Sequence, residues 1–336
     1  MSKPTLADRL RGLIIPIGVI GALYGLSTIE LGVPHREMDE PEIELRDRFL
    51  GVASDGNVVW AVGKDAKIVR SEDAGKTFTV QNSPVPVNFQ DIAMWDPQTA
   101  VIVGNAATVL TTSDGGATWD HQTLDMPVDG SGKLFRARLG PDGRVWTVSE
   151  LNYIAVSADK GKTWQRVTQD DTDQAWNDIA FAGNRICVSG EFGKLACSDD
   201  QGTTWVEKST GLDVSLMSLA FRDDMNGVAV GLNGLIISTA DAGETWTAHP
   251  MEGLTRHIFD VAWGGNRWVA VGDKGLLLFG DESAQNWEVT RLTETDFAWH
   301  TAIEVLSADA FMASGQTLGV YQGGTWKMFG NLMPGG

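Results

Sequence analysis

Basic residues are scarce in this chain of 336 residues, and their scarcity limits what the chain can bind. Lys and Arg number 26 against 44 Asp and Glu, which gives a formal net charge of −18. DNA, RNA and anionic lipid surfaces attract proteins with a positive surface. We therefore expect no nucleic-acid partner, and an acidic surface instead favours basic or neutral partners.

Residue patterns that carry chemistry are also missing. The five histidines are dispersed without an H-x-x-x-H spacing, the two cysteines are not at zinc-ligand spacing, and no G-x-S-x-G elbow is present. Asp and Glu are plentiful, as glycosidases require, but the sequence singles out no catalytic pair. We expect no catalytic residue, no metal ion and no cofactor, and so a protein that acts by binding.

One charge-free run of seventeen residues lies near the N-terminus, "LIIPIGVIGALYGLSTI" (13–29). A membrane-spanning helix needs roughly 17–25 residues. Lys and Arg precede the run and Glu and Asp follow it, so the positive-inside rule places residues 1–12 in the cytoplasm. We expect a transmembrane anchor over 13–33 and a periplasmic remainder, hence a single-pass inner-membrane protein. A cleaved signal peptide is the alternative, but no small-x-small cleavage site follows the run.

The expected anchor contains small residues at helix-packing spacing. Gly21 and Gly25 form G-x-x-x-G, which lets a second transmembrane helix approach closely. The alternative is that glycine is simply common in membrane helices. Residues 34–48, "PHREMDEPEIELRDR", are polar and acidic with two prolines, and we expect them to be a linker.

A motif ending in an aromatic residue recurs about every 40 residues. Its spacing is 39 to 45 residues across seven copies, and the aromatic residues are Phe78, Trp119, Trp164, Trp205, Trp246, Trp287 and Trp326. Between copies lie several short apolar or β-branched runs separated by Gly, Asn or Asp. This pattern predicts an all-β protein, a seven-bladed β-propeller over residues 49–330.

The repeated motif reads S/T-x-D-x-G-x-T-W, as in "SADKGKTW" (157–164) and "SDDQGTTW" (198–205). Its Asp can accept hydrogen bonds from its own turn, its Gly suits a left-handed residue, and its Trp can fill the space between sheets. One active site needs unlike residues in unlike roles, so a motif repeated in every blade indicates a structural function. The structural aspartates are Asp73, Asp114, Asp159, Asp200 and Asp241.

Charged residues interrupt a row of small residues near the expected central axis. Aligning the first strands gives one position occupied by Gly51, Asp91, Arg136, Asp178, Ser218, Asp260 and Ala302. Two residues further on, five of the seven blades carry Ala, and Arg138 and Glu304 are the exceptions. Either Arg138 pairs with Glu304, or Arg136 with an Asp, inside a wet channel; or the charges form a polar mouth that grips a partner loop. The expected partner-binding residues are Arg136, Arg138, Asp91, Asp178, Asp260, Phe192 and Glu304, with Phe192, the one aromatic residue among the turn tips, as an interface anchor.

The two cysteines flank one predicted hairpin turn, "GEFG" (190–193). Counting outward from Phe192 places Cys187 opposite Cys197. A disulfide is permitted outside the cytoplasm, although a register offset of one residue would turn one side chain to the other face.

The motif is similar to the Asp-box, or BNR, repeats that also occur in sialidases and some glycanases. A sialidase is not indicated, because the Arg-Ile/Leu-Pro signature is absent. Only Tyr153 and Tyr321 remain outside the apolar run to supply its tyrosine nucleophile.

A second resemblance covers roughly residues 49–330. The stretches "WAVGKDAKIVRSEDAGKTF" (60–78), "AVIVGNAATVLTTSDGGATW" (100–119) and "GVAVGLNGLIISTADAGETW" (227–246) resemble the photosystem II assembly and stability factor family. Both the hairpin turn and the box recur in register. The resemblance implies a seven-bladed propeller outside the membrane that escorts a membrane subunit without enzymatic activity.

The chain departs from that family in two respects. Photosynthetic members resemble one another in an Arg-rich surface patch and, in cyanobacteria, a lipidated N-terminus, whereas this chain has a net charge of −18 and an apolar run. Relatives in non-photosynthetic bacteria tend to accompany permeases of the resistance–nodulation–division (RND) class. We therefore expect an accessory or assembly subunit of an inner-membrane complex, with an RND-type permease as partner. The alternatives are a photosystem II assembly factor and an Asp-box glycan-binding or glycanase domain.

Overall fold

The computed structural model describes residues 42–44, 46–127, 132–168 and 172–330. The expected anchor over 13–33, with Gly21 and Gly25, lies outside these residues, as does most of the linker. Within the described ranges, no helix has the length and apolar character needed to cross a membrane.

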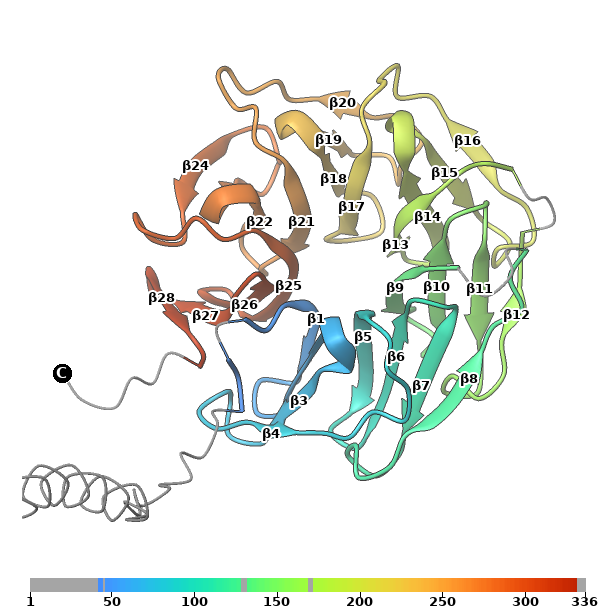
Figure 1. Cartoon of the computed structure of the whole chain (residues 1–336). Helices are drawn as coiled ribbons and strands as arrows, with labels where there is room; N and C mark the ends of the chain where they lie inside the picture. The colour runs from blue at the N-terminus through green and yellow to red at the C-terminus, as the bar shows by residue number, and fades with distance from the viewer. Residues whose placement is uncertain (1–41, 45, 128–131, 169–171, 331–336) are drawn as a thin grey trace, which may run out of the picture. The chain divides into compact units, whose positions relative to one another are not determined.

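Seven four-stranded antiparallel sheets are arranged in a ring around a central axis (Figure 1). The prediction of an all-β, seven-bladed propeller is confirmed. Blade 1 contains β1 (Phe49–Ser54), β2 (Val59–Gly63), β3 (Ile68–Ser71) and β4 (Thr79–Val80). Blade 2 contains β5 (Phe89–Asp96), β6 (Thr99–Gly104), β7 (Thr108–Thr112) and β8 (Asp120–Thr123). Blade 3 contains β9 (Leu134–Leu139), β10 (Val145–Ser149), β11 (Ile154–Ser157) and β12 (Gln165–Arg166).

The remaining four blades follow the same order. Blade 4 contains β13 (Trp176–Ala182), β14 (Arg185–Gly190), β15 (Leu195–Ser198) and β16 (Val206–Lys208). Blade 5 contains β17 (Leu216–Phe221), β18 (Gly227–Gly231), β19 (Ile236–Thr239) and β20 (Thr247–Ala248). Blade 6 contains β21 (Ile258–Trp263), β22 (Trp268–Gly272), β23 (Leu276–Gly280) and β24 (Trp287–Arg291). Blade 7 contains β25 (His300–Ser307), β26 (Ala310–Gly315), β27 (Leu318–Gln322) and β28 (Thr325–Met328).

Burial decreases from the second strand of a blade to its outermost strand. The strand β2, "VWAVG", is buried throughout, whereas β4 is exposed. Both faces of an inner strand pack against neighbouring blades, which favours a nearly continuous apolar run over alternation.

Short turns join the second and third strands of four blades, and they define what we call the turn face. They are η1 (Lys64–Ala66), η2 (Glu191–Gly193), η3 (Leu232–Gly234) and η4 (Asp273–Gly275). Each holds a residue with positive φ at its tip, such as Phe192 at 54° and Asn233 at 56°. The repeated glycines therefore form hairpin turns, as the sequence indicates.

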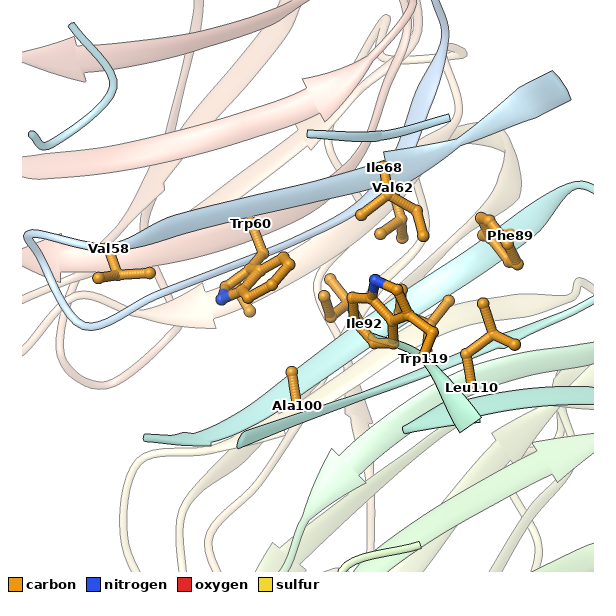
Figure 2. Close-up of a cluster of buried hydrophobic side chains, with 11 residues drawn as sticks. Val58, Trp60, Val62, Ile68, Phe89, Ile92, Ala100, Leu110 and Trp119 are labelled. Atoms are coloured by element: carbon orange, nitrogen blue, oxygen red, sulfur yellow. The ribbon is translucent and has the colours of Figure 1, made fainter. Parts of the chain in front are cut away.

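The hydrophobic core consists of layers between adjacent blades. Figure 2 shows the layer between blades 1 and 2, where Trp60 of β2 and the box residue Trp119 lie among aliphatic side chains. The two indole rings are 5.5 Å apart between centroids and nearly perpendicular. This edge-to-face arrangement is a favoured geometry for aromatic pairs.

Each Asp-box is a self-contained hydrogen-bonded turn. In blade 1 the Ser71 hydroxyl donates to Asp73 Oδ1 over 2.8 Å, and the Gly75 amide donates to Ser71 Oγ over 2.9 Å. The Thr77 amide and hydroxyl donate to the two carboxylate oxygens of Asp73. These hydrogen bonds, with the Thr77 amide first, lower the pKa of Asp73 to about 2. The carboxylates of Asp114, Asp159, Asp200 and Asp241 are held in the same way.

The ring closes where blade 7 meets blade 1, and among the described residues no sheet contains strands from both ends of the chain. The strands of every sheet are consecutive in sequence. Ile43 and Phe329 belong to the apolar layer at this junction, and the Phe329 ring lies 5.2 Å from the Phe78 ring. Side-chain packing, rather than a shared sheet, therefore seals the propeller.

Candidate functional site

The first strands of the blades place seven residues at one level around the axis. In each blade the pairing with the second strand shifts by one residue just before this position. We call this set the axial ring: Gly51, Asp91, Arg136, Asp178, Ser218, Asp260 and Ala302. The alignment made from the sequence identified these positions as equivalent.

The polar residues of the axial ring connect one blade to the next. Asp91 Oδ2 accepts the amide of Ala137 over 3.0 Å. In the same way Asp178 accepts the amide of Leu219, Ser218 Oγ that of Val261, and Asp260 that of Ile303. In each case the donor follows the axial-ring position of the next blade by one residue. These side chains therefore connect adjacent blades at four of the seven junctions between blades.

The two arginines lie among the ring carboxylates. Arg138 pairs with Asp91 over 3.0 Å and with Asp178 over 3.4 Å. Arg136 lies 3.9 Å from Asp178 and 3.7 Å from Asp260, and it also donates to the carbonyl of Thr301 over 3.2 Å. All three aspartates are buried. The structure thus brings five of the expected partner-binding residues together, but they bind mainly one another.

Glu304 lies one level beyond the ring and is half-buried. Within the described ranges, no Lys, Arg or His side chain forms an ion pair with Glu304 within 4.0 Å. Arg138 pairs with Asp91 and Asp178 instead. Burial raises the pKa of the Glu304 carboxyl to about 8, although the Arg138 guanidinium acts in the opposite direction. Like-charge repulsion from Asp91 and Asp260 contributes to this raised pKa.

The ion network separates two cavities on the axis. The upper funnel opens on the turn face, has a volume of about 460 Å³, and is lined by Leu50, Lys64, Asn88, Gln90, Asn105, Lys133, Phe135, Arg136, Asn177, Met217, Trp299 and Thr301. The lower funnel opens at the other ends of the first strands and has a volume of about 450 Å³. Its walls include Leu139, Phe181, Phe221, Trp263 and Val305, with Arg138, Asp260 and Glu304 among its charged lining.

The upper funnel differs from the chain as a whole in its charge. Three cationic side chains line it and, among the described residues, no carboxylate does. Its amides are held in place: Gln90 donates to Asn105 Oδ1 over 2.9 Å, and Asn177 donates to the carbonyl of Leu216 over 2.8 Å. In a chain with 18 more acidic than basic residues, such a lining favours an anionic or amide-rich ligand.

Sequence reasoning missed most of the upper funnel. Gln90, Phe135, Asn177 and Met217 each occupy the position just before the axial ring, where the strand pairing shifts. Strict alternation along a strand predicts that such residues face away from the axial row. Large polar or apolar residues recur at this one position in several blades, and this recurrence is the sequence signal that could have identified the funnel lining.

Three further predicted residues lie away from the funnels. Phe192 is 62% exposed at the tip of η2, on the turn face. Cys187 and Cys197 face each other on β14 and β15 and are joined by a disulfide bond, which lies in the apolar layer between blades 4 and 5.

The chain is similar in sequence to photosystem II assembly factors. The family model described as "Photosynthesis system II assembly factor YCF48" matches residues 80–172 and 208–314. The chain is 24% identical over 255 residues to the photosystem II assembly lipoprotein Ycf48 of Synechococcus sp. strain CC9902, covering 72% of this chain and 74% of that protein. It is 21% identical over 264 residues to the chloroplastic stability/assembly factor HCF136 of Arabidopsis thaliana, covering 70% and 64%.

A solved relative has the same fold. The structure described as YCF48 bound to D1 peptide matches with a TM-score of 0.68 at 20% identity, covering 82% of this chain and 93% of that one. The expectation of an RND-type permease as partner is wrong, because the relatives are photosystem II assembly proteins and this one is bound to a D1 peptide. The sequence argument gave too much weight to the net charge of the whole surface, whereas the upper funnel is locally cationic.

Proposed function

The chain belongs to the family of photosystem II assembly factors described by the YCF48 model, and from this premise we propose that it is a non-enzymatic assembly factor that binds a polypeptide segment of a client protein. The client we propose is a photosystem II subunit. The observation that carries the proposal is the cationic, amide-lined upper funnel on the turn face.

The funnel offers the groups that an extended peptide needs. Lys64 and Lys133 can pair with an acidic side chain or a terminal carboxylate. Fixed side-chain amides can exchange hydrogen bonds with the peptide backbone, and Phe135 and Trp299 provide apolar contact. The nearby axial carboxylates are engaged by arginines and backbone amides, which argues against their use as an acid–base pair.

We also propose that the protein acts at a membrane surface. One relative is named a lipoprotein, and in this chain the apolar run 13–29, within the expected anchor over 13–33, would supply the attachment. Attachment keeps the funnel near a membrane-bound client, so a weak contact suffices for binding.

A peptide array tests the proposal. Overlapping peptides of the D1 protein would be measured against the full chain by fluorescence anisotropy at two salt concentrations. We expect at least one acidic or C-terminal peptide to bind, and the Lys133→Glu variant to bind it about tenfold or more weakly, because a charge-assisted contact is replaced by repulsion. Affinity should fall as salt rises.

Lys162→Glu is the matched control, because Lys162 is exposed on a box turn and does not line the upper funnel. It should bind the peptide as the unmodified chain does. Equal affinities for Lys133→Glu and the unmodified chain would contradict the upper funnel as the site. Failure of every D1 peptide to bind would contradict the proposed client.

A further inference from the structure

The lower funnel combines aromatic walls with an acidic floor. The rings of Phe181, Phe221 and Trp263 are half-buried at equivalent positions of blades 4, 5 and 6. The Trp263 ring makes a cation–π contact with the Arg222 guanidinium, which lies 5.6 Å from the ring centroid. Aromatic faces beside a carboxylate are the surroundings in which ammonium and guanidinium groups bind.

Acidic side chains outnumber basic ones on the axis. Three carboxyl groups, those of Asp91, Asp178 and Asp260, surround the two guanidinium groups of Arg136 and Arg138. Glu304 adds a further carboxyl on the funnel side of this network. Both arginines already pair with the aspartates, and among the described residues no ion pair engages Glu304, so its carboxyl is the group left for a further cation in the funnel.

We propose that the lower funnel binds an organic cation, a primary ammonium or guanidinium group on a short apolar stem, with its charge at Glu304 and its stem against the aromatic walls. A volume of about 450 Å³ accommodates a group of this size. The site lies at the opposite end of the axis from the upper funnel and does not depend on the proposed peptide binding. The cation can belong to a free amine or to a Lys or Arg side chain of another protein.

Binding is coupled to pH through Glu304. Its carboxyl is faced by Arg138, which favours the ionised form, and by Asp91 and Asp260, which oppose it. Burial and these carboxylates raise the pKa of Glu304 to about 8, so its carboxyl stays mostly protonated below about pH 8. A bound cation favours the carboxylate, so binding should release a proton at neutral pH and should strengthen between about pH 6 and pH 9.

Calorimetry on the full chain tests the inference with two probes. One is n-pentylamine, and the other is an acetylated, amidated pentapeptide of four alanines around one lysine. The same peptide with norleucine in place of lysine is the uncharged control. We expect saturable binding of at least one cationic probe, stronger at pH 9 than at pH 6, with proton release that differs between buffers of unlike ionisation enthalpy.

The variant Glu304→Gln keeps the shape of the side chain and removes its charge. We expect it to weaken binding at pH 9 about tenfold or more and to abolish both the pH dependence and the proton release. Glu252→Gln removes an exposed carboxylate that does not line the funnel, and it should change none of these. Binding of the amine alone identifies a small-molecule ligand, and binding of the lysine peptide identifies a protein side chain.

Two results would overturn the inference. One is equal binding by Glu304→Gln and the unmodified chain. The other is no saturable binding of either cationic probe at millimolar concentration and pH 9.

Discussion

Glu304 shows how one residue can make stability depend on pH. Its carboxyl is half-buried beside two ring carboxylates, and its pKa is raised from 4.5 to about 8. The folded state therefore holds this proton more tightly than the unfolded chain does. The stabilisation from the bound proton is fully present below about pH 4.5 and is lost as pH rises through about 8.

We expect Glu304→Gln to remove this dependence. At pH 8.5 the variant should be more stable than the unmodified chain by about 1–3 kcal/mol, after allowance for solvent screening of a partly exposed group. At pH 5 the difference should be small. Chemical denaturation at the two pH values, followed by circular dichroism, measures it. A difference in stability that is the same at both pH values would show that Glu304 is not the titrating group.

At the scale of the strand, the sequence predicted the repeated strands and turns. It did not predict the one-residue shift in the pairing between the first and second strands of each blade. The apolar runs, the turn glycines and the boxes recur with one period, so the sequence predicted the blades and the equivalence of Asp91, Arg136 and Asp178. The bulge before these positions changes which residues face the axis. A bulge depends on how two strands pair, and a run such as "LFRARL" of β9 does not reveal it.

The disulfide also acts at the scale of the strand, because it joins neighbours in one hairpin. Cys187 and Cys197 are ten residues apart in sequence, and a loop of that size corresponds to about 2–3 kcal/mol of stabilisation in the chain-entropy model. We expect reduction to lower the melting temperature of the unmodified chain. The double variant Cys187→Ala/Cys197→Ala should melt at or below the temperature of the reduced unmodified chain. Its melting temperature should not change when reductant is added.

Thermal melts with and without dithiothreitol, with a thiol count on the unfolded protein, provide the measurement. An unmodified chain that melts at the same temperature in both conditions, although the thiol count shows full reduction, would contradict a stabilising disulfide.

At the scale of the whole molecule, the junction of blades 7 and 1 is held by side chains. Phe329 is 9% exposed and lies against Phe78, while Ile43 joins the same apolar layer. Replacing a buried Phe by Ala removes its apolar contacts and leaves a cavity. The stability of the ring should therefore depend on residues close to both ends of the described chain.

We expect Phe329→Ala to destabilise the propeller by about 3 kcal/mol. Val289→Ala is the control, because Val289 is 44% exposed on β24, and it should change stability by less than about 0.5 kcal/mol. Hydrogen exchange should locate the first opening of Phe329→Ala in β1 and β26. Equal stability of the two variants would indicate that the junction is held by other contacts.

Because each blade uses consecutive residues, the propeller can be completed in the order in which the chain is synthesised. Six blades can form before β25 to β28 emerge, but until then one side of blade 1 and one side of blade 6 lack their neighbours. Apolar residues such as Val52 and Val59 of blade 1 and Val271 of blade 6 stay uncovered during that interval. Residues 300–328 of blade 7 therefore cover both of these edges, and a nascent chain that stops before them is an open arc with two exposed apolar edges that favour aggregation.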